Sequence, residues 1–156
     1  MALPRFKVQN MASFEEAAKT IAENEGKTKV IGGGTDLLHG FKDNIYEEYP
    51  ETVLNLRSIA DSAYLTEDEE GLHIGALTTL HDIETSDLVK EKYSVLAEAA
   101  YTVASPQIRN ASTIGGNICQ EPRCWYFRNA DNLFHCMRKG GEACPAFIGR
   151  TDIHSI

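Results

Sequence analysis

All four cysteines of this 156-residue chain lie within 26 positions, from Cys119 to Cys144, and a glycine pair at Gly115-Gly116 stands just before them. A glycine pair lets backbone N–H groups approach an anion such as phosphate, because no side chain intervenes. Closely spaced thiols indicate a metal site. The chain must therefore place an irregular loop beside a tight turn here, and the combination predicts redox chemistry rather than simple packing.

The composition excludes several classes of protein. A net charge of −8 argues against nucleic acid or an anionic membrane as the main partner. No apolar run approaches the roughly 20 residues that a membrane span needs, and the N-terminal sequence MALPRFKVQN lacks the apolar region of a signal peptide. We therefore predict a cytoplasmic protein with reduced thiols, in which the four cysteines bind a metal or a cluster rather than form two disulfides.

The order of predicted elements indicates an α+β fold. Apolar periodicity and turn residues predict strands at 6–8, 29–31 and 52–56, a helix at 13–24, a hairpin at 64–76, and helices at 79–88 and 95–104. Ser13 and Glu16 form the signature of a capping box. Pro106 is expected to end the last helix, with irregular chain at 108–118 and a loop without periodicity from Cys119 onward.

The first glycine turn, GGGTD at 32–36, directly follows a predicted strand. Glycine amides and the Thr35 hydroxyl in this position are typical of a pyrophosphate site. The turn is not a Walker loop, because no GK[ST] follows, and it is not the G-x-G-x-x-G dinucleotide motif. The alternative is a glycine-rich turn that only lets the strand reverse.

The second glycine turn, TIGGN at 113–117, lies far away in the sequence. Its glycines again expose amides, and Thr113 and Asn117 add polar side chains. We expect the two turns to hold one diphosphate from both sides, although a lone glycine pair is also common as a purely structural turn.

The spacing of the cysteines is Cys119-x4-Cys124-x11-Cys136-x7-Cys144. No C-x2-C pair is present, so a zinc finger or ribbon is a poor match. An iron–sulfur cluster with four thiolates tolerates such irregular spacing, and the neighbouring arginines and aromatic residues suit its charge and its need for shielding. The alternative is four free thiols, some of them buried as small apolar residues.

Three stretches carry a resemblance to a known family: VIGGGTDLL at 30–38, IGALTTLHDIE at 74–84 and ASPQIRNASTIGGNICQ at 104–120. The chain resembles the FAD-binding subunit of the molybdenum hydroxylases, the family of xanthine dehydrogenase. The resemblance implies the two-subdomain FAD-binding fold of the vanillyl-alcohol-oxidase (PCMH) type. It assigns 1–56 to the first β-α-β subdomain and 57–156 to the first part of a second α+β subdomain.

The resemblance also implies a set of residues for FAD, which covers both glycine turns and their flanks. Arg109 precedes the second turn and would shape it. The implied cofactor-binding residues are Ile31, Gly32, Gly33, Gly34, Thr35, Asp36, Leu37, Ile108, Thr113, Gly115, Gly116 and Asn117.

The loop at 119–144 is similar to that of a subset of the family, with 4-hydroxybenzoyl-CoA reductase and a bacterial aldehyde oxidoreductase as examples, whose flavin subunit carries an extra 4Fe-4S cluster. This similarity implies Cys119, Cys124, Cys136 and Cys144 as ligands. In the reductase the last ligand falls nearer the position of Ile153, so Cys119 would replace it.

The implied function is electron transfer in a molybdopterin-dependent oxidoreductase. The implied partners are a large subunit with molybdopterin and a small subunit with 2Fe-2S clusters, and no side chain of this chain is expected to act as a catalytic acid or base. The family's FAD domain extends beyond 156 residues, so we expect a truncated chain, a fragment or one product of a split gene, with a separate chain completing the domain in the last case. The alternatives are a flavin-free assembly module and a zinc-stabilised interaction domain.

Overall fold

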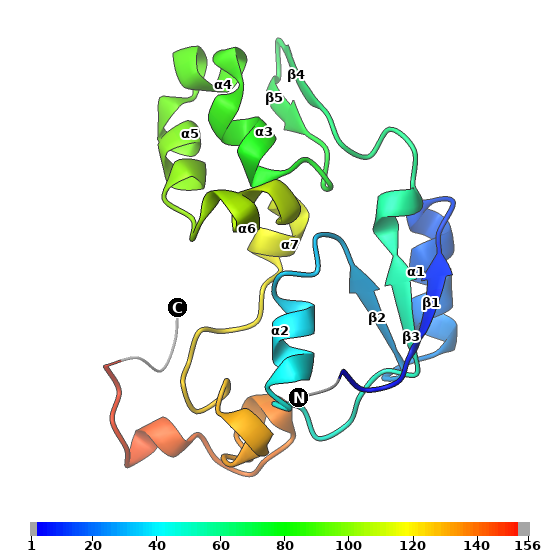
Figure 1. The fold of residues 1–156 in the computed structure, drawn as a ribbon, viewed down its shortest axis with the longest axis vertical. Coiled ribbons are helices and arrows are strands. Elements are labelled where there is room, and N and C mark those ends of the chain that lie inside the picture. Colours follow the sequence, from blue (N-terminus) through cyan, green and yellow to red (C-terminus); the bar gives the residue numbers. More distant parts are fainter. Residues whose placement is uncertain (1–2, 153–156) are drawn as a thin grey trace.

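The computed structural model describes residues 3–152, which form three parts in chain order (Figure 1). A small parallel sheet with two helices comes first, and a helical part with a hairpin follows. The chain then runs back beneath helix α2 (Leu37–Lys42) as an extended segment. None of the helices in the described range is long and apolar enough to cross a membrane.

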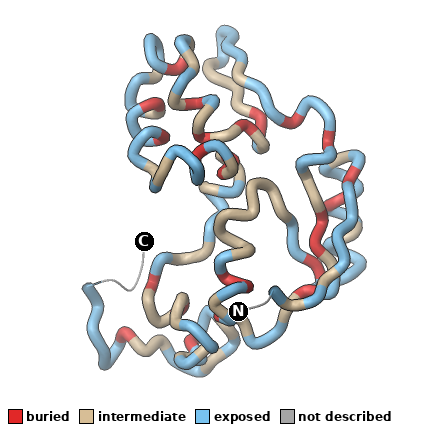
Figure 2. Tube along the Cα trace, in the orientation of Figure 1, coloured by how far each residue is buried: buried red, intermediate tan, exposed pale blue. Residues whose placement is uncertain are grey.

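The sheet has the strand order β1-β3-β2, with β1 at Lys7–Asn10, β2 at Thr28–Ile31 and β3 at Thr52–Asn55. Both pairings are parallel, with Val53 opposite Val8 on one side and Leu54 opposite Val30 on the other. Because β3 is central, Val53 and Leu54 are completely buried (Figure 2). The predicted β-α-β arrangement of strands is therefore confirmed.

Helix α1 (Phe14–Glu23) begins after Ser13, whose hydroxyl accepts a hydrogen bond from the Glu16 amide at 3.1 Å. The Glu16 carboxylate accepts from the Ala12 amide at 2.7 Å rather than from the Ser13 amide. Ser13 therefore caps the helix as predicted, but the reciprocal bond of the predicted capping box is not formed. The helix contributes less to the core than its pattern predicts, since Phe14 and Ile21 stay 43% and 39% exposed. A sheet of three four-residue strands is too small to cover the whole helix face.

The second part consists of the hairpin β4 (Leu65–Asp68) and β5 (Gly71–Ile74) with three packed helices. These are α3 (Leu80–Thr85), α4 (Asp87–Lys92) and α5 (Ser94–Tyr101). Their core contains Leu80, Ile83 and Val89. The predicted helix at 79–88 is divided, because Ser86 caps a new helix, α4, whose Val89 is completely buried.

The prediction of irregular chain at 108–118 is wrong, because two short helices lie there: α6 (Pro106–Ala111) and α7 (Ile114–Ile118). Pro106 does not end a helix but begins α6 at its first position, where a missing N–H costs nothing. Ser105 caps α6, and the hydroxyl of Thr113 caps α7 by accepting from the Gly116 amide.

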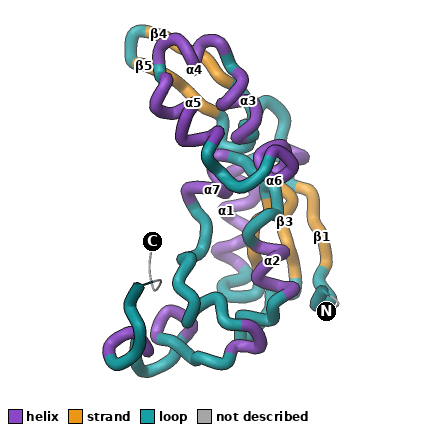
Figure 3. Tube along the Cα trace, turned by 60° about the vertical axis from the view of Figure 1, so that its left-hand side comes forward, coloured by secondary structure: helices purple, strands orange, loops and turns teal. Residues whose placement is uncertain are grey.

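The remaining chain, which we call the cysteine segment (residues 119–150), is loop-like as predicted. It contains only short 3-10 turns at Ala130–Asn132, Met137–Lys139 and Pro145–Phe147 (Figure 3). Its buried side chains, Cys124, Phe127 and Cys136, pack against Ile45 and Tyr46 of the first part.

We predict that Ile83→Ala lowers the free energy of unfolding by about 2–5 kcal/mol, because Ile83 is fully buried at the centre of the helical part. Chemical denaturation measures the change. The control is Val95→Ala on α5, whose side chain is 80% exposed and whose replacement should change stability by less than about 0.5 kcal/mol. Equal effects of the two variants would contradict this description of the core.

Candidate functional site

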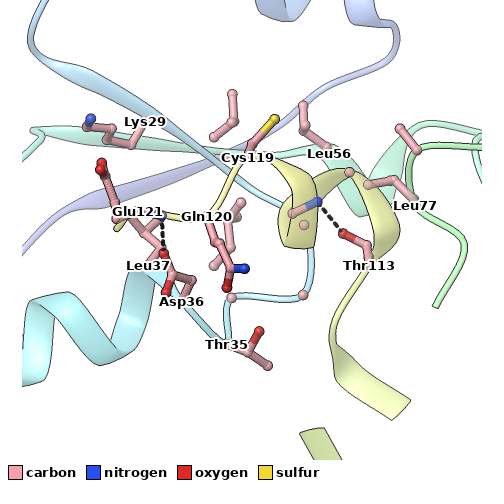
Figure 4. A pocket seen from close by; sticks show the side chains of 18 of the residues that line it. Lys29, Thr35, Asp36, Leu37, Leu56, Leu77, Thr113, Cys119, Gln120 and Glu121 are labelled. Atoms are coloured by element: carbon pink, nitrogen blue, oxygen red, sulfur yellow. Dashed lines mark hydrogen bonds between the residues drawn. The ribbon is translucent and has the colours of Figure 1, made fainter. Parts of the chain in front are cut away.

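A cavity of about 400 Å³ lies between the two glycine turns (Figure 4). All the predicted cofactor-binding residues line it except Ile108 and Asn117. Ile108 lies on α6 with 38% of its surface exposed, and Asn117 lies on α7 away from the cavity lining. The structure thus brings together two turns that are separated by more than 75 positions in the sequence.

The first turn touches the backbone directly before the second turn. A Cβ atom added to Gly33 would lie 2.0 Å from the carbonyl oxygen of Ala111, so only glycine fits at this position. The hydroxyls of Thr35 and Ser112 form a hydrogen bond of 2.8 Å beside this contact. Gly34 adopts a positive φ of 76°, which favours glycine and turns the chain into α2.

The amides of the two turns differ in their hydrogen bonds. In the second turn the Gly115 amide donates to the Ala76 carbonyl (2.9 Å), the Gly116 amide to the Thr113 hydroxyl (3.2 Å) and the Asn117 amide to the Thr113 carbonyl (2.9 Å). The amides of the first turn, at 33–36, have no acceptor among residues 3–152. Successive amides without acceptors are the donors from which anion-binding concavities are built, and only the first of the two turns has them.

The carboxylate of Asp36 is engaged by the beginning of the cysteine segment rather than left free in the cavity. Its Oδ1 accepts hydrogen bonds from Arg123 Nη1 and Arg128 Nη2, each at 2.7 Å. Its Oδ2 accepts from the Glu121 amide at 3.0 Å. Burial by itself raises the pKa of Asp36, but the Glu121 amide and the two guanidinium groups outweigh it, so the pKa lies below 3.8. Asp36 is therefore ionised at neutral pH.

Sequence reasoning missed the apolar walls of the cavity, which include Leu56, Ala76, Leu77 and Tyr46. Leu56 comes one position after strand β3 and Ala76 two positions after strand β5, so position after a strand was the available signal. Burial raises the pKa of Tyr46 to about 12. Its phenol therefore enters the cavity in the neutral form.

Arg109 anchors helix α6, which leads into the second turn. Its side chain is buried, with Nε 2.6 Å from Oε2 of Glu84 on α3 in an ion pair that lacks hydrogen-bond alignment. Its Nη1 donates to the Val103 carbonyl at 3.0 Å. Arg109 thus fixes α6, and with it the start of the second turn, against the helical part.

The four cysteines do not gather at one place. Cys119 is exposed and lines the cavity between the glycine turns. The other three, Cys124, Cys136 and Cys144, line a second cavity of about 370 Å³ together with Phe127 and Arg138. Within residues 3–152 no three histidine, cysteine or acidic side chains converge on the position of a single metal ion.

A lysine lies beside the thiols of the second cavity. Nζ of Lys139 donates to the carbonyls of Ile45 and Phe127, both at 3.1 Å. Burial lowers the pKa of Lys139, and the nearby Cys136 and Cys124 partly offset this effect. Two buried donors of the same segment, Trp125 Nε1 and Arg128 Nη1, have no acceptor within the described residues, which leaves them available to an added acceptor.

Comparison with known proteins identifies the family. The family model for the "FAD binding domain in molybdopterin dehydrogenase" matches residues 4–133. This chain belongs to that family. The match includes both glycine turns and ends before Cys136, so it covers the cavity between the turns but not the whole cysteine segment.

Curated relatives agree with this membership. The nicotinate dehydrogenase FAD-subunit of Eubacterium barkeri is 37% identical over 117 residues, which are 69% of this chain and 39% of the relative. The aldehyde oxidoreductase FAD-binding subunit PaoB of Escherichia coli is 32% identical over 151 residues, which are 97% of this chain and 46% of the relative. The chain thus spans less than half the length of these relatives.

The fold is shared with solved structures. Carbon monoxide dehydrogenase from Hydrogenophaga pseudoflava matches with a TM-score of 0.70 and 33% identity, over 76% of this chain and 40% of that chain. Quinoline 2-oxidoreductase from Pseudomonas putida 86 matches with a TM-score of 0.68 and 26% identity, over 74% of this chain and 40% of that chain. These similarities confirm the predicted α+β fold of an FAD-binding domain.

We predict that Gly33→Ala destabilises the protein more than Gly116→Ala does. An added methyl group at Gly33 meets a backbone carbonyl at 2.0 Å, whereas at Gly116 it meets only the Thr113 hydroxyl, at 3.0 Å. Overpacking of this kind lowers the free energy of unfolding by about 1–3 kcal/mol. Gly33→Ala should reach or exceed the upper end of this range, because the backbone at Ala111 must move to admit the methyl group. Thermal and chemical unfolding of both variants measure the difference. Similar stabilities would show that the two turns do not touch at Gly33.

Proposed function

We propose that this chain binds FAD in the cavity between the glycine turns, with the pyrophosphate on the first turn. The observation that carries the proposal is the run of amides at 33–36 without acceptors, in residues that line a cavity of about 400 Å³. Cofactor cavities commonly measure about 300–1,000 Å³ and combine apolar walls with a few fixed polar groups. The residues present therefore fit the cofactor.

The second turn does not bind the pyrophosphate through its amides in this proposal, although the sequence predicted that both turns would do so. Because the amides of Gly115, Gly116 and Asn117 are already hydrogen-bonded within the chain, the first turn supplies the free donors. Gly116 contributes by the absence of a side chain, which leaves room for a ligand along the backbone. At Gly115 an added Cβ would lie 2.8 Å from the Ala76 carbonyl oxygen, so this glycine permits the contact between the second turn and Ala76. Ile31 and Leu37 flank the first turn and provide apolar contacts for the cofactor.

Bound FAD accepts and releases one or two electrons, and the chain binds and orients it. We propose that the chain acts as the FAD-binding subunit of a cytoplasmic molybdopterin-dependent oxidoreductase, with a large molybdopterin subunit and a small iron–sulfur subunit as partners. Its relatives support this role, because they include FAD subunits and a medium chain of oxidoreductases. Since those relatives are more than twice as long, further residues or a separate chain would complete the PCMH-type domain.

We further propose that the cysteine segment holds a 4Fe-4S cluster. Cys124, Cys136 and Cys144 line one cavity, which also contains Phe127 and the cationic Arg138, a set that suits a thiolate-bound cluster. The alignment with PaoB spans 151 of the 156 positions and so includes this segment. Cys119 lies in the other cavity, which favours a fourth ligand elsewhere. The position of Ile153 falls outside the described residues.

We predict that Gly116→Val weakens FAD binding about tenfold or more, equivalent to about 1.4 kcal/mol. The added side chain enters a space where only the Thr113 hydroxyl lies within 4 Å, so it occupies the cavity rather than the core. Quenching of flavin fluorescence during titration measures the affinity. Asn117→Ala is the control, because Asn117 does not line the cavity. Unchanged affinity in Gly116→Val would contradict the proposed site.

We predict that Cys124→Ser, Cys136→Ser and Cys144→Ser each lower the iron and acid-labile sulfide content of anaerobically purified protein. Cys119→Ser is the matched control and should leave both unchanged, because Cys119 lines the other cavity. Elemental analysis and electron paramagnetic resonance measure the outcome. A colourless protein with stoichiometric zinc would contradict the cluster and indicate a zinc-stabilised interaction domain. A protein that binds neither flavin nor iron would indicate an assembly module.

A further inference from the structure

The first glycine turn is attached to the cysteine segment through one side chain, Asp36. Three hydrogen bonds reach its carboxylate, from Arg123, from Arg128 and from the Glu121 amide. All three donors belong to the first ten positions of the cysteine segment, and all lie 85 or more positions from Asp36 in the sequence.

Local helix structure does not account for these contacts. Asp36 stands at the N-cap of α2, but its side chain caps no amide of that helix. The carboxylate therefore turns away from its own helix toward the arginines. The pair of Asp36 and Arg128 is largely buried, with side chains 18% and 13% exposed. A buried pair is screened by salt much less than a pair at the surface.

The turn that carries Asp36 also touches the chain directly before the second glycine turn. Gly33 lies against the backbone of Ala111, and Thr35 is hydrogen-bonded to Ser112. The turn at 32–36 therefore lines the cavity and contacts both the end of α6 and the cysteine segment. Any ligand that fixes this turn also fixes the position of the Asp36 carboxylate.

We propose that Asp36 is a positioning residue that couples occupancy of the cavity to the order of the cysteine segment. The inference rests on the proposed binding of FAD between the glycine turns. When Arg123 and Arg128 are in place, they neutralise Asp36, which lines the cavity. When the segment detaches, an unpaired carboxylate remains beside the site of the anionic pyrophosphate.

The two states of the segment therefore bind FAD with different affinity, which is the condition for coupling between a ligand and a conformational equilibrium. The coupling is reciprocal: FAD stabilises the attached segment by the same factor by which the attached segment strengthens FAD binding. Electrostatics gives the sign: in the attached state Asp36 holds two guanidinium groups beside the cavity and is itself neutralised, whereas in the detached state its carboxylate faces the anionic ligand unpaired. Both effects require the Asp36 carboxylate.

The test uses the rate at which N-ethylmaleimide alkylates each thiol of the reduced, metal-free 156-residue chain, mapped by mass spectrometry with and without FAD. Cys124 and Cys136 are buried, so they react only when the segment opens locally. Cys119 is exposed and lines the cavity, so bound FAD shields it directly. The alkylation of Cys119 and the flavin fluorescence thus report whether FAD occupies the cavity. The alkylation of the two buried thiols reports how often the cysteine segment opens.

We expect saturating FAD to slow the alkylation of Cys124 and Cys136 at least about fivefold, the lower end of common coupling factors. In Asp36→Asn the slowing should fall below about twofold, while FAD still shields Cys119. Asp68→Asn is the matched control on the distant strand β4 and should behave as the unaltered chain. Arg123→Gln, at a half-exposed position, provides a second variant that removes one of the two arginines and should reduce the slowing partially.

The outcomes separate this inference from the proposed function. If FAD shields Cys119 but slows the buried thiols equally in the unaltered chain and in Asp36→Asn, the coupling role of Asp36 is wrong. If Asp36→Asn only accelerates alkylation by the same factor with and without FAD, Asp36 is purely structural and the inference again fails. If FAD does not shield Cys119 and the flavin fluorescence does not change when the chain is added, the proposed function fails and the coupling fails with it.

Discussion

The contact between Gly33 and the backbone of Ala111 sets the distance between the two glycine turns, and the other features of the site depend on it. At this distance the hydroxyls of Thr35 and Ser112 are within hydrogen-bond reach. The turns then enclose a cavity with free amides on one side and side-chain-free backbone on the other. A single missing Cβ thus decides whether the sheet and the helical part form one site.

The sequence predicted those features that depend on local chemistry. Both glycine turns, the cap at Ser13 and the loop-like cysteine segment were recognisable, because glycine, cap residues and lack of periodicity act over a few positions. Pro106 was misread because proline both ends helices and begins them. The capping residue before it, Ser105, was the signal that distinguishes the two cases.

Features that depend on long-range contacts could not be read from the sequence. The partners of Asp36 lie 85 to 92 positions away, and no spacing rule connects them, so Asp36 was interpreted only as a cofactor contact. The same limit applies to Cys119. It is close in sequence to the other cysteines, but helix α7 ends at Ile118 and leaves Cys119 at the cavity between the turns.

Lys139 gives the cysteine segment a second attachment, at the opposite end from Asp36. Its ammonium group bonds one carbonyl of the first part, Ile45, and one of the segment itself, Phe127. The chain between the two attachments is a closed loop whose ends the protein holds without help from a ligand. Of the three thiols that line the second cavity, Cys124 and Cys136 lie within this loop and Cys144 follows it. A group that fills the cavity therefore meets two thiols on chain that is already closed, and its binding does not have to meet the entropic cost of closing that loop.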